Sequence, residues 1–387
     1  MTTYTPMLAI LFWFAVFFIV YTYILYPLIL FLLTTGRKQP VYATPNEWPS
    51  VSIIIAAHNE EAIIREKIEN TLDLDYPEGA LEIMVASDGS TDLTNEIVEQ
   101  YMDRGVRLLV LEERGGKTRA QNEAFKQVRA EILVFSDANS MYDQYALKGL
   151  VRPFSHSNVG CVCGELQYIN PSDHAVGKGE GLYWKYEQFL KRRESLLSSA
   201  LGANGSIYAI RRQLFEYLDP DIISDFVMPI RVWRQGFRAV YEYRAIAKEH
   251  TGDTFLKEFN RRTRIIARSL FGLWSQRSVL NLFRFGSFAF QMISHKLMRW
   301  LVPFMLISAF IINGFLINEM VYHYLWILQF IFYGLALGGS IMPNTIGRFA
   351  LFYVPAHFCT MNAGAFWGVL LFLTGRRYQI WQPMSRK

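Results

Sequence analysis

Two long stretches that almost lack charge constrain the fold of this chain more than any other feature. Residues 1–36 contain no Asp, Glu, Lys or Arg, and residues 303–375 contain only Glu319 and Arg348. As a helix, the apolar run 7–33 would be about 40 Å long, which exceeds the ~30 Å hydrocarbon core of a bilayer. These stretches exclude a purely soluble globule, a disordered protein and a disulfide scaffold.

The charges beside the first apolar run predict its orientation. No charge precedes the run, and Arg37 and Lys38 follow it. Because a basic start and a small-residue cleavage site are missing, we expect residues 1–36 to be a retained transmembrane anchor and not a signal peptide. Basic residues favour the inner side, so the domain that follows is expected on the cytoplasmic face of the cell (inner or plasma) membrane.

The C-terminal region, residues 300–375, predicts two or three membrane helices. Three segments in it approach spanning length: 300–318, 322–342 and 349–373. Three crossings would leave the basic tail, residues 376–387, outside, whereas its Arg and Lys residues favour the inside. The last segment contains Pro355, His357 and Asn362. A re-entrant or interfacial course is therefore the alternative to a third crossing.

Residues 253–299 combine apolar and basic side chains at helical spacing. This pattern predicts amphipathic helices at the membrane interface. The alternative is a buried core helix whose basic face is solvated. The whole chain carries a net charge of only +5, and it has no basic run with interleaved aromatic residues. We therefore expect a membrane partner and no nucleic acid partner.

Residues 37–252 have the composition of a soluble domain and the pattern of an α/β fold. Short runs rich in β-branched residues alternate with stretches of helical periodicity. The strands are predicted at 51–57, 81–87, 106–111 and 132–136, and the helices at 59–72, 91–101 and 118–128. Continuous apolar strands that alternate with helices are typical of a parallel sheet covered on both faces. The three cysteines lack zinc-ligand spacing, so we expect buried thiols.

Polar or glycine-rich residues follow each of the four predicted strands, at residues 57–60, 87–90, 115–117 and 136–139. Ligands of such sheets bind at the carboxyl ends of the strands, so we expect one common site. The glycine patterns of dinucleotide-binding and Walker-type ATPase sites are both missing. Asp137, two positions before Asn139, suits a hard divalent cation, Mg²⁺ or Mn²⁺, held mainly by substrate phosphates. Helix capping is the alternative role for this pair.

Separated motifs in a fixed order carry a resemblance to a known family. They are Val51-Ser-Ile-Ile-Ile-Ala-Ala-His-Asn-Glu60, Asp88-Gly89-Ser90, Gly115-Gly116-Lys117, Asp137-Ala138-Asn139, Gly202-Ala203-Asn204-Gly205-Ser206, Ser224-Asp225-Phe226, Arg261-Arg262-Thr263-Arg264-Ile265 and Ser294-His-Lys-Leu-Met-Arg-Trp300. In these motifs the chain resembles the family 2 glycosyltransferases, membrane-bound inverting enzymes that include relatives of cellulose and hyaluronan synthases. The resemblance implies a cytosolic, Rossmann-like α/β domain of the GT-A type with a mostly parallel sheet, an N-terminal transmembrane helix and a C-terminal helical transmembrane region.

The resemblance also implies roles for individual residues. Asp225 would be the catalytic base, and Asp137 with Asn139 would bind the metal. A nucleotide sugar, expected to be a UDP-sugar, would be held by Ala57, Glu60, Asp88, Lys117, Asp137, Asn204, Arg261 and Arg264. Within that set, Asp88 would contact the base and Arg264 the diphosphate.

Three departures from the family pattern matter for the expected chemistry. Asn139 stands where relatives have a second metal-binding Asp, which predicts weaker metal binding. Ser224 replaces the acid that precedes the base. Ile265 replaces a Trp that helps polymer-forming relatives hold the growing chain, which argues against processive synthesis.

The expected reaction is transfer of a sugar from a nucleotide sugar to a polysaccharide or lipid acceptor. The departing diphosphate needs positive charge, which a divalent ion and Lys or Arg supply, and the acceptor hydroxyl needs a base such as Asp225. Capping of a helix at residues 226–235 is the alternative role for Asp225. The alternative function is a non-catalytic membrane protein that senses nucleotide sugars or assists transport.

Overall fold

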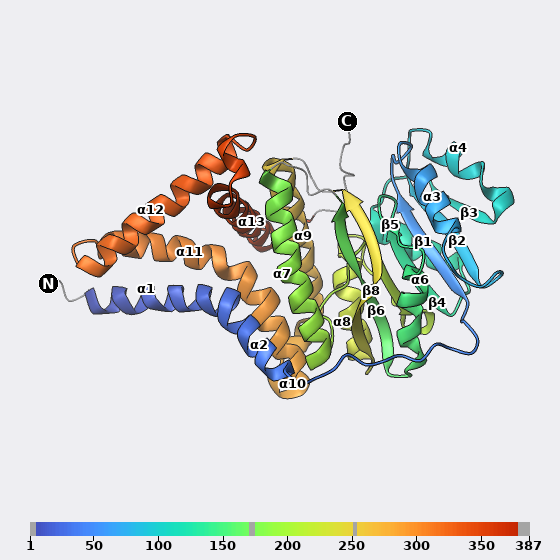
Figure 1. The fold of residues 1–387 in the computed structure, drawn as a ribbon, viewed down its shortest axis with the longest axis horizontal. Helices are drawn as coiled ribbons and strands as arrows, with labels where there is room; N and C mark the ends of the chain where they lie inside the picture. The colour runs from blue at the N-terminus through green and yellow to red at the C-terminus, as the bar shows by residue number, and fades with distance from the viewer. Residues whose placement is uncertain (1–4, 170–174, 251–253, 378–387) are drawn as a thin grey trace.

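The computed structural model describes residues 5–169, 175–250 and 254–377. Figure 1 shows two parts, a sheet flanked by helices and a group of long apolar helices. Helices α7 (Ala175–Leu197) and α9 (Phe255–Ser275) lie between the two parts (Figure 1).

The first part is built on an eight-stranded sheet in the order β3-β2-β1-β4-β7-β6-β8-β5. The first four strands in this order are parallel, whereas β7 is antiparallel to both of its neighbours. The strands are β1 (Val51–Ala57), β2 (Leu81–Asp88), β3 (Val106–Leu111), β4 (Ile132–Asp137), β5 (Met141–Tyr142), β6 (Val159–Ile169), β7 (Ile207–Arg211) and β8 (Arg238–His250). The prediction of a mostly parallel α/β sheet is confirmed.

Two buried clusters cover the two faces of this sheet. One contains apolar residues of α3 (Ile64–Leu72), α4 (Thr94–Glu99) and α6 (Ala146–Val151). The other contains residues of α5 (Lys117–Gln127), α8 (Ser224–Arg234) and α9. Because β1 and β4 are buried on both faces, their sequences read as continuous apolar runs instead of alternating ones.

The first predicted helix, residues 59–72, begins later than its periodicity indicated. Asn59 has a φ of +53°, outside the right-handed helical region. Its side-chain oxygen accepts a hydrogen bond from the backbone N–H of Thr91 at 2.8 Å. The helix therefore begins at Ile64, because Asn59 is used to join two strand-end loops.

Four helices of the described chain are long and apolar enough to cross a membrane: Thr5–Thr34, Leu282–Phe315, Met320–Ile341 and Ala350–Leu373. The first comprises α1 (Thr5–Val20), a π-helical turn (Tyr21–Leu25) and α2 (Tyr26–Thr34). The second comprises α10 (Leu282–Gln291), a π-helical turn (Met292–Leu297) and α11 (Met298–Phe315). It therefore begins within the segment 253–299 that was predicted to be interfacial. The last two helices are α12 (Met320–Ile341) and α13 (Ala350–Leu373).

The chain returns to the sheet after α13. The Nη1 atom of Arg377 lies 2.8 Å from the Oδ2 atom of Asp221, a buried residue just before α8. Helix α13 also packs along α9 and α7. The start of the basic tail thus contacts the sheet domain, and its predicted place on the inner side of a membrane stays a prediction.

Candidate active site

The polar strand-end segments meet at one edge of the sheet because β1, β2 and β4 are parallel neighbours. Ala56 of β1 pairs with Asp137 of β4, and Ala57 pairs with Ser87 of β2. A cavity of about 1060 Å³ opens at this edge. Eight of the residues predicted from the sequence line it: Glu60, Lys117, Asp137, Asn139, Asn204, Asp225, Arg261 and Arg264.

Lys117, Asp137 and Asp225 converge on Gly205. The Nζ atom of Lys117 forms an ion pair with Asp137 and donates a hydrogen bond to the Gly205 carbonyl at 3.0 Å. A Cβ atom on Gly205 would lie 2.7 Å from that Nζ, 3.1 Å from Oδ2 of Asp225 and 3.6 Å from Oδ2 of Asp137. The absence of a side chain at position 205 therefore keeps the space between one ammonium and two carboxylates open.

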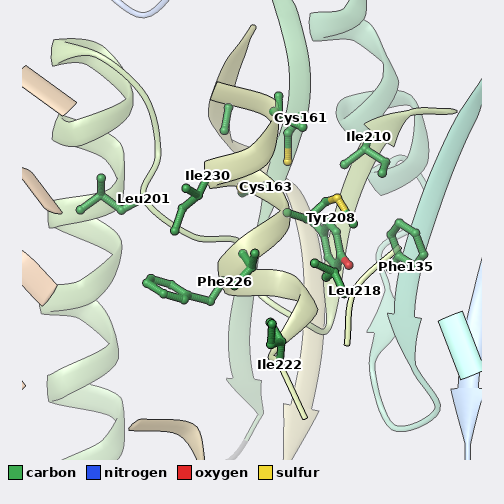
Figure 2. Close-up of a cluster of buried hydrophobic side chains, with 14 of the residues drawn as sticks. Phe135, Cys161, Cys163, Leu201, Tyr208, Ile210, Leu218, Ile222, Phe226 and Ile230 are labelled. Carbon is green, nitrogen blue, oxygen red and sulfur yellow. The ribbon is translucent and has the colours of Figure 1, made fainter. Parts of the chain in front are cut away.

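Packing beneath α8 fixes the position of Asp225, the second residue of that helix. Phe226 and Ile230 of α8 belong to one buried cluster with Cys161, Cys163 and Tyr208 (Figure 2). Both of these cysteines are free and buried, as predicted, whereas the third, Cys359, is free but only partly buried. The backbone carbonyl of Asp225 also accepts a hydrogen bond from the N–H of Ala203 at 2.8 Å, which joins α8 to the glycine-rich segment.

The loop before α8 is held by two buried side chains that sequence analysis missed. Arg268 of α9 donates hydrogen bonds to the carbonyls of Pro220 (2.8 Å) and Ile222 (2.9 Å). The hydroxyl of Thr118 donates to the same Ile222 carbonyl at 2.7 Å. Arg268 follows Arg264 by one helical turn, and that spacing is the sequence signal that a second arginine of α9 faces the site.

The charges around Asp225 act in opposite directions on its pKa. Burial raises the pKa of the Asp225 carboxyl above its ordinary value, and the negative charge of Asp137 adds to this effect. Lys117, Lys191 and Arg268 lower it. Asp225 also lies in the first turn of α8, where the helix dipole favours its ionised form. A raised pKa makes a carboxylate a better proton acceptor.

Asp88 and Ala57 lie beside the main cavity, where they line a small adjoining one with Lys117 and Asp137. Asp88 is buried, and its two oxygens accept hydrogen bonds from the backbone N–H groups of Gly115 (2.8 Å) and Gly116 (2.7 Å). In this structure Asp88 therefore holds the loop before Lys117. Its predicted contact with a nucleotide base stays a prediction.

Asn204 is a buried connection between the glycine-rich segment and α7. Its Nδ2 atom donates to the Gly164 carbonyl at 2.8 Å, and its Oδ1 atom accepts a hydrogen bond from Lys191. Lys191 is buried against the ring of Trp184, and burial lowers its pKa. Sequence analysis missed Lys191, because its position within a long helix carries no motif.

The two predicted arginines of α9 differ in their surroundings. Arg261 forms ion pairs with Glu258, at 2.7 Å, and with the buried Glu180 of α7. Burial and the neighbouring arginines lower the pKa of Arg264 to about 10. Removing a guanidinium from water next to like charges is unfavourable, so a bound anion would relieve the cost at Arg264.

Three acidic side chains besides Asp137 and Asp225 line the cavity and were not predicted to bind or react: Glu187, Glu249 and Glu258. His250, which neighbours Glu249, lies exposed at the end of β8. Burial and the charge of Asp137 raise the pKa of Glu249. Lys67 of α3 is buried and does not line the cavity, and burial lowers its pKa to about 7.

The side chains at the end of β4 fit a divalent cation that takes most of its ligands from a substrate. Asp137 and Asn139 each offer oxygen to the cavity, which suits Mg²⁺ or Mn²⁺. Across residues 5–169, 175–250 and 254–377, no three His, Cys, Asp or Glu residues form a group that could hold a metal by themselves. The predicted weakening of metal binding by Asn139 stays a prediction.

Comparison with known proteins identifies a domain within residues 52–218. The profile of "Glycosyl transferase family 2" matches residues 52–218, which include the predicted strand-end motifs and the glycine-rich segment. The chain carries a family 2 glycosyltransferase domain. The resemblance predicted from the motifs is confirmed.

The names of the curated relatives describe different products. The chain is 27% identical over 240 residues to a probable glycosyltransferase (YdaM) of Bacillus subtilis, over 56% of this chain and 54% of that protein. It is 28% identical over 172 residues to the beta-monoglucosyldiacylglycerol synthase of a Nostoc species, covering 43% and 37%. It is 25% identical over 239 residues to the poly-beta-1,6-N-acetyl-D-glucosamine synthase of Staphylococcus aureus, covering 60% and 54%. The matches thus span about half or less of these relatives.

A solved structure shares the fold over nearly the whole chain. The mannosyltransferase PcManGT of Pyrobaculum calidifontis, solved with GDP-mannose and Mn²⁺, superimposes with a TM-score of 0.72. The match covers 95% of this chain and 99% of that one, at 20% sequence identity. The GT-A fold predicted for the glycosyltransferase domain is therefore confirmed.

Proposed function

We propose that the protein is a membrane-embedded, inverting glycosyltransferase that moves a sugar from a nucleoside-diphosphate sugar to a lipid or polysaccharide acceptor. The observation that carries this proposal is the convergence of Lys117, Asp137 and Asp225 on the space beside Gly205. One cavity holds these groups together with Arg264. A cation-binding carboxylate, a base and two cations are what such a transfer needs.

The donor diphosphate would bind where the positive charges face the cavity. Lys117 and Arg264 would neutralise its developing charge, which is where preorganised charge is most effective. Asp137 and Asn139 would hold a divalent ion, Mg²⁺ or Mn²⁺, which stabilises the leaving diphosphate as a Lewis acid when bound. The fold neighbour was solved with Mn²⁺ and a GDP-sugar, which supports a metal and leaves the predicted UDP-sugar as one of two donor classes to test.

Asp225 would take the proton of the acceptor hydroxyl as its oxygen attacks the anomeric carbon. The bond from that carbon to the diphosphate breaks as the new bond forms, so the nucleoside diphosphate leaves from the opposite face. A single displacement inverts the anomeric centre, and an α-linked donor would give a β-linked product. The raised pKa of Asp225 supports this role.

The far end of the cavity favours a lipid as the acceptor. Its walls include Tyr23 of the first apolar helix and Met361, Asn362 and Trp367 of α13. Trp367 lines the cavity and is also 49% exposed, so it borders both the cavity and the surface of the protein. A hydroxyl-bearing lipid would reach Asp225 along this wall without leaving the bilayer.

The contact between Arg377 and Asp221 places the end of α13 beside the sheet domain. This favours an even number of membrane crossings by the helices that follow the domain. Three full crossings would end on the opposite face, far from Asp221. Among the four candidate spans, α13 is the most buried within the protein, and it packs along α9. We therefore infer that α13 runs at the interface beside α9, while the helices before it cross.

Purified protein in vesicles provides the test of this function. Vesicles made from a bacterial lipid extract, with UDP-sugars or GDP-sugars and Mn²⁺, should release free nucleoside diphosphate and form a glycolipid. A sensor or transport-associated protein would bind a nucleotide sugar without releasing the diphosphate. If no nucleotide sugar releases its nucleoside diphosphate in the presence of either lipids or oligosaccharides, the proposal is contradicted.

A further inference from the structure

Buried polar side chains connect two loops of the active site from behind. Ser140 comes directly after Asn139, the second residue of the proposed metal pair, and Ser206 comes directly after Gly205. Both serines are buried. Glu249, at the end of β8, accepts hydrogen bonds from both of their hydroxyls with the same oxygen, Oε1.

Lys67 approaches the same connection from helix α3. It is completely buried, and its Nζ atom donates a hydrogen bond to the Ser140 carbonyl at 2.5 Å. The ammonium also lies over the ring of Tyr142, 3.9 Å from the ring centroid. The hydroxyl of Tyr142 donates to the Ser206 carbonyl at 3.0 Å, so these side chains connect the two loops a second time. We call Lys67, Ser140, Tyr142, Ser206 and Glu249 the brace.

Stability alone is a poor explanation for the brace. A lysine and a carboxylate are expensive to bury, and apolar residues of similar volume often stabilise a protein as well or better. The brace instead joins elements that the backbone leaves separate. Within the sheet, β4 pairs with β7 through Ile207, but the loops that carry Asn139 and Gly205 extend beyond this ladder.

We propose that Glu249 is a positioning residue that holds the Asp137–Asn139 loop against the Gly205 loop. Asp137 and Asp225 then keep the separation at which a divalent cation and a nucleoside diphosphate bind together. Partners behind a metal ligand orient it, and their loss commonly weakens metal binding or activity by about 10- to 100-fold. This inference rests on the proposed function, because it assumes that the cation and the diphosphate share this cavity.

Calorimetry with UDP and GDP, each with and without Mn²⁺, tests the brace on the full-length protein. Wild type should bind the nucleotide more tightly with Mn²⁺. Glu249→Gln removes the negative charge but keeps an oxygen that can accept from a serine. This variant should lose about tenfold or more of the Mn²⁺ enhancement, whereas nucleotide binding without Mn²⁺ should stay near the wild-type value.

Glu242→Gln is the matched control, because Glu242 is a buried carboxylate on the same strand that pairs with Arg244, at 2.7 Å, away from the cavity. It should lower the melting temperature and leave the Mn²⁺ enhancement unchanged. Ser206→Ala, which removes a single hydroxyl, replaces Glu249→Gln if that variant fails to fold, with an expected loss of about threefold to tenfold.

The outcomes separate the two ideas. A folded Glu249→Gln or Ser206→Ala protein with the full wild-type enhancement would overturn the brace and leave the proposed function standing. If wild type binds the nucleotide with equal affinity with and without Mn²⁺, the metal role in the proposed function is overturned, and the brace with it. Selective loss of the enhancement in the brace variant, with the control unchanged, supports the inference.

Discussion

The two ends of the cavity are built in different ways. At the donor end, Lys117 begins α5 and Asp137, 20 residues later, ends β4, and both border an open space. At the other end, beside the apolar helices and called the membrane end, Glu187 of α7 pairs with Arg299 of α11, 112 residues later. Buried behind this end, Glu194 pairs with His295, 101 residues later. The donor end places the Lys117–Asp137 ion pair and Asp225 around a space that a ligand can fill, whereas the membrane end holds its ion pairs between helices.

This difference assigns different tasks to the two ends. The charges around Gly205 border an open space even though Lys117 pairs with Asp137, and this arrangement is typical of a site that binds an anion and a cation. Paired charges between α7 and α11 connect the sheet domain to the apolar helices. Tyr26 of the first apolar helix joins them, because its hydroxyl donates to Glu194 at 2.8 Å. We expect the transfer reaction to depend on the donor end, and the packing of the sheet domain against the apolar helices to depend on the membrane end.

The largest effect is expected from Asp225→Asn. The amide keeps the shape of the side chain but cannot accept a proton, so turnover should fall by about 10²–10⁴. Binding of the nucleoside diphosphate should change little. Asp137→Asn should behave differently and weaken both binding and turnover, because it removes the proposed metal ligand. Calorimetry and product formation on both variants make this comparison, and wild-type turnover in folded Asp225→Asn would end the base assignment.

The same contrast explains what the sequence could predict. Strand-end residues such as Asp137 and Lys117 could be placed together because parallel strands end at a common edge, a rule that needs only local patterns. Glu187 and Lys191 could not, because each lies within a regular helix and meets its partner only after separate segments pack. Arg268 is intermediate, because its spacing from Arg264 gives a signal but its loop partners do not. The long apolar helices were predicted from composition, but the return of Arg377 to the domain depends on tertiary packing.

The second effect concerns stability and tests the membrane end. Glu187→Gln leaves Arg299 buried without its counter-charge, which typically costs about 3–5 kcal/mol. Thermal unfolding in detergent should show this loss, while nucleotide binding to the folded protein should stay close to wild type. Glu123→Gln, at an exposed pair with Lys126, is the control and should cost about 0–1 kcal/mol. Equal melting temperatures for the two variants would contradict the structural role of the Glu187 pair.

The stabilisation by Glu187 should also depend on pH. Burial by itself raises the pKa of this carboxyl, but Arg299, Lys296 and His295 together hold the pKa well below its ordinary value of 4.5. A lowered folded-state pKa adds stability above the unfolded value, and this stability disappears as the pH falls toward the folded value. The difference in melting temperature between wild type and Glu187→Gln should therefore be full at pH 7 and shrink below about pH 4.5.

A smaller effect is expected from Gly205→Ala, which fills the open space of the donor end. The added Cβ would lie 2.7 Å from Nζ of Lys117, so the lysine must move away from Asp137. Displacement of catalytic groups by about 1 Å can cost about 10²-fold in rate, and we expect a loss of 10- to 100-fold in kcat/KM. Gly236→Ala, whose Cβ would meet no atom within 4 Å, is a control for the loss of a glycine away from the site. Because Gly236 has a φ of +87°, we expect the control to destabilise the fold without affecting nucleotide binding.

The smallest effect is expected from Asp88→Asn, and it decides between two roles for this residue. If Asp88 acts by holding Gly115 and Gly116, the amide keeps one acceptor and loses the other charge-assisted hydrogen bond, which costs about 1.5 kcal/mol, or roughly tenfold in donor affinity. That loss should be equal for UDP and GDP, because the loop reaches both through Lys117. If Asp88 instead contacts the base, as the family resemblance implies, the substitution should change the ratio of UDP to GDP affinity. Titration of both nucleotides with wild type and Asp88→Asn measures this ratio. An unchanged ratio would assign Asp88 to the loop, and the base would then be recognised by other residues near Ala57 and Glu60.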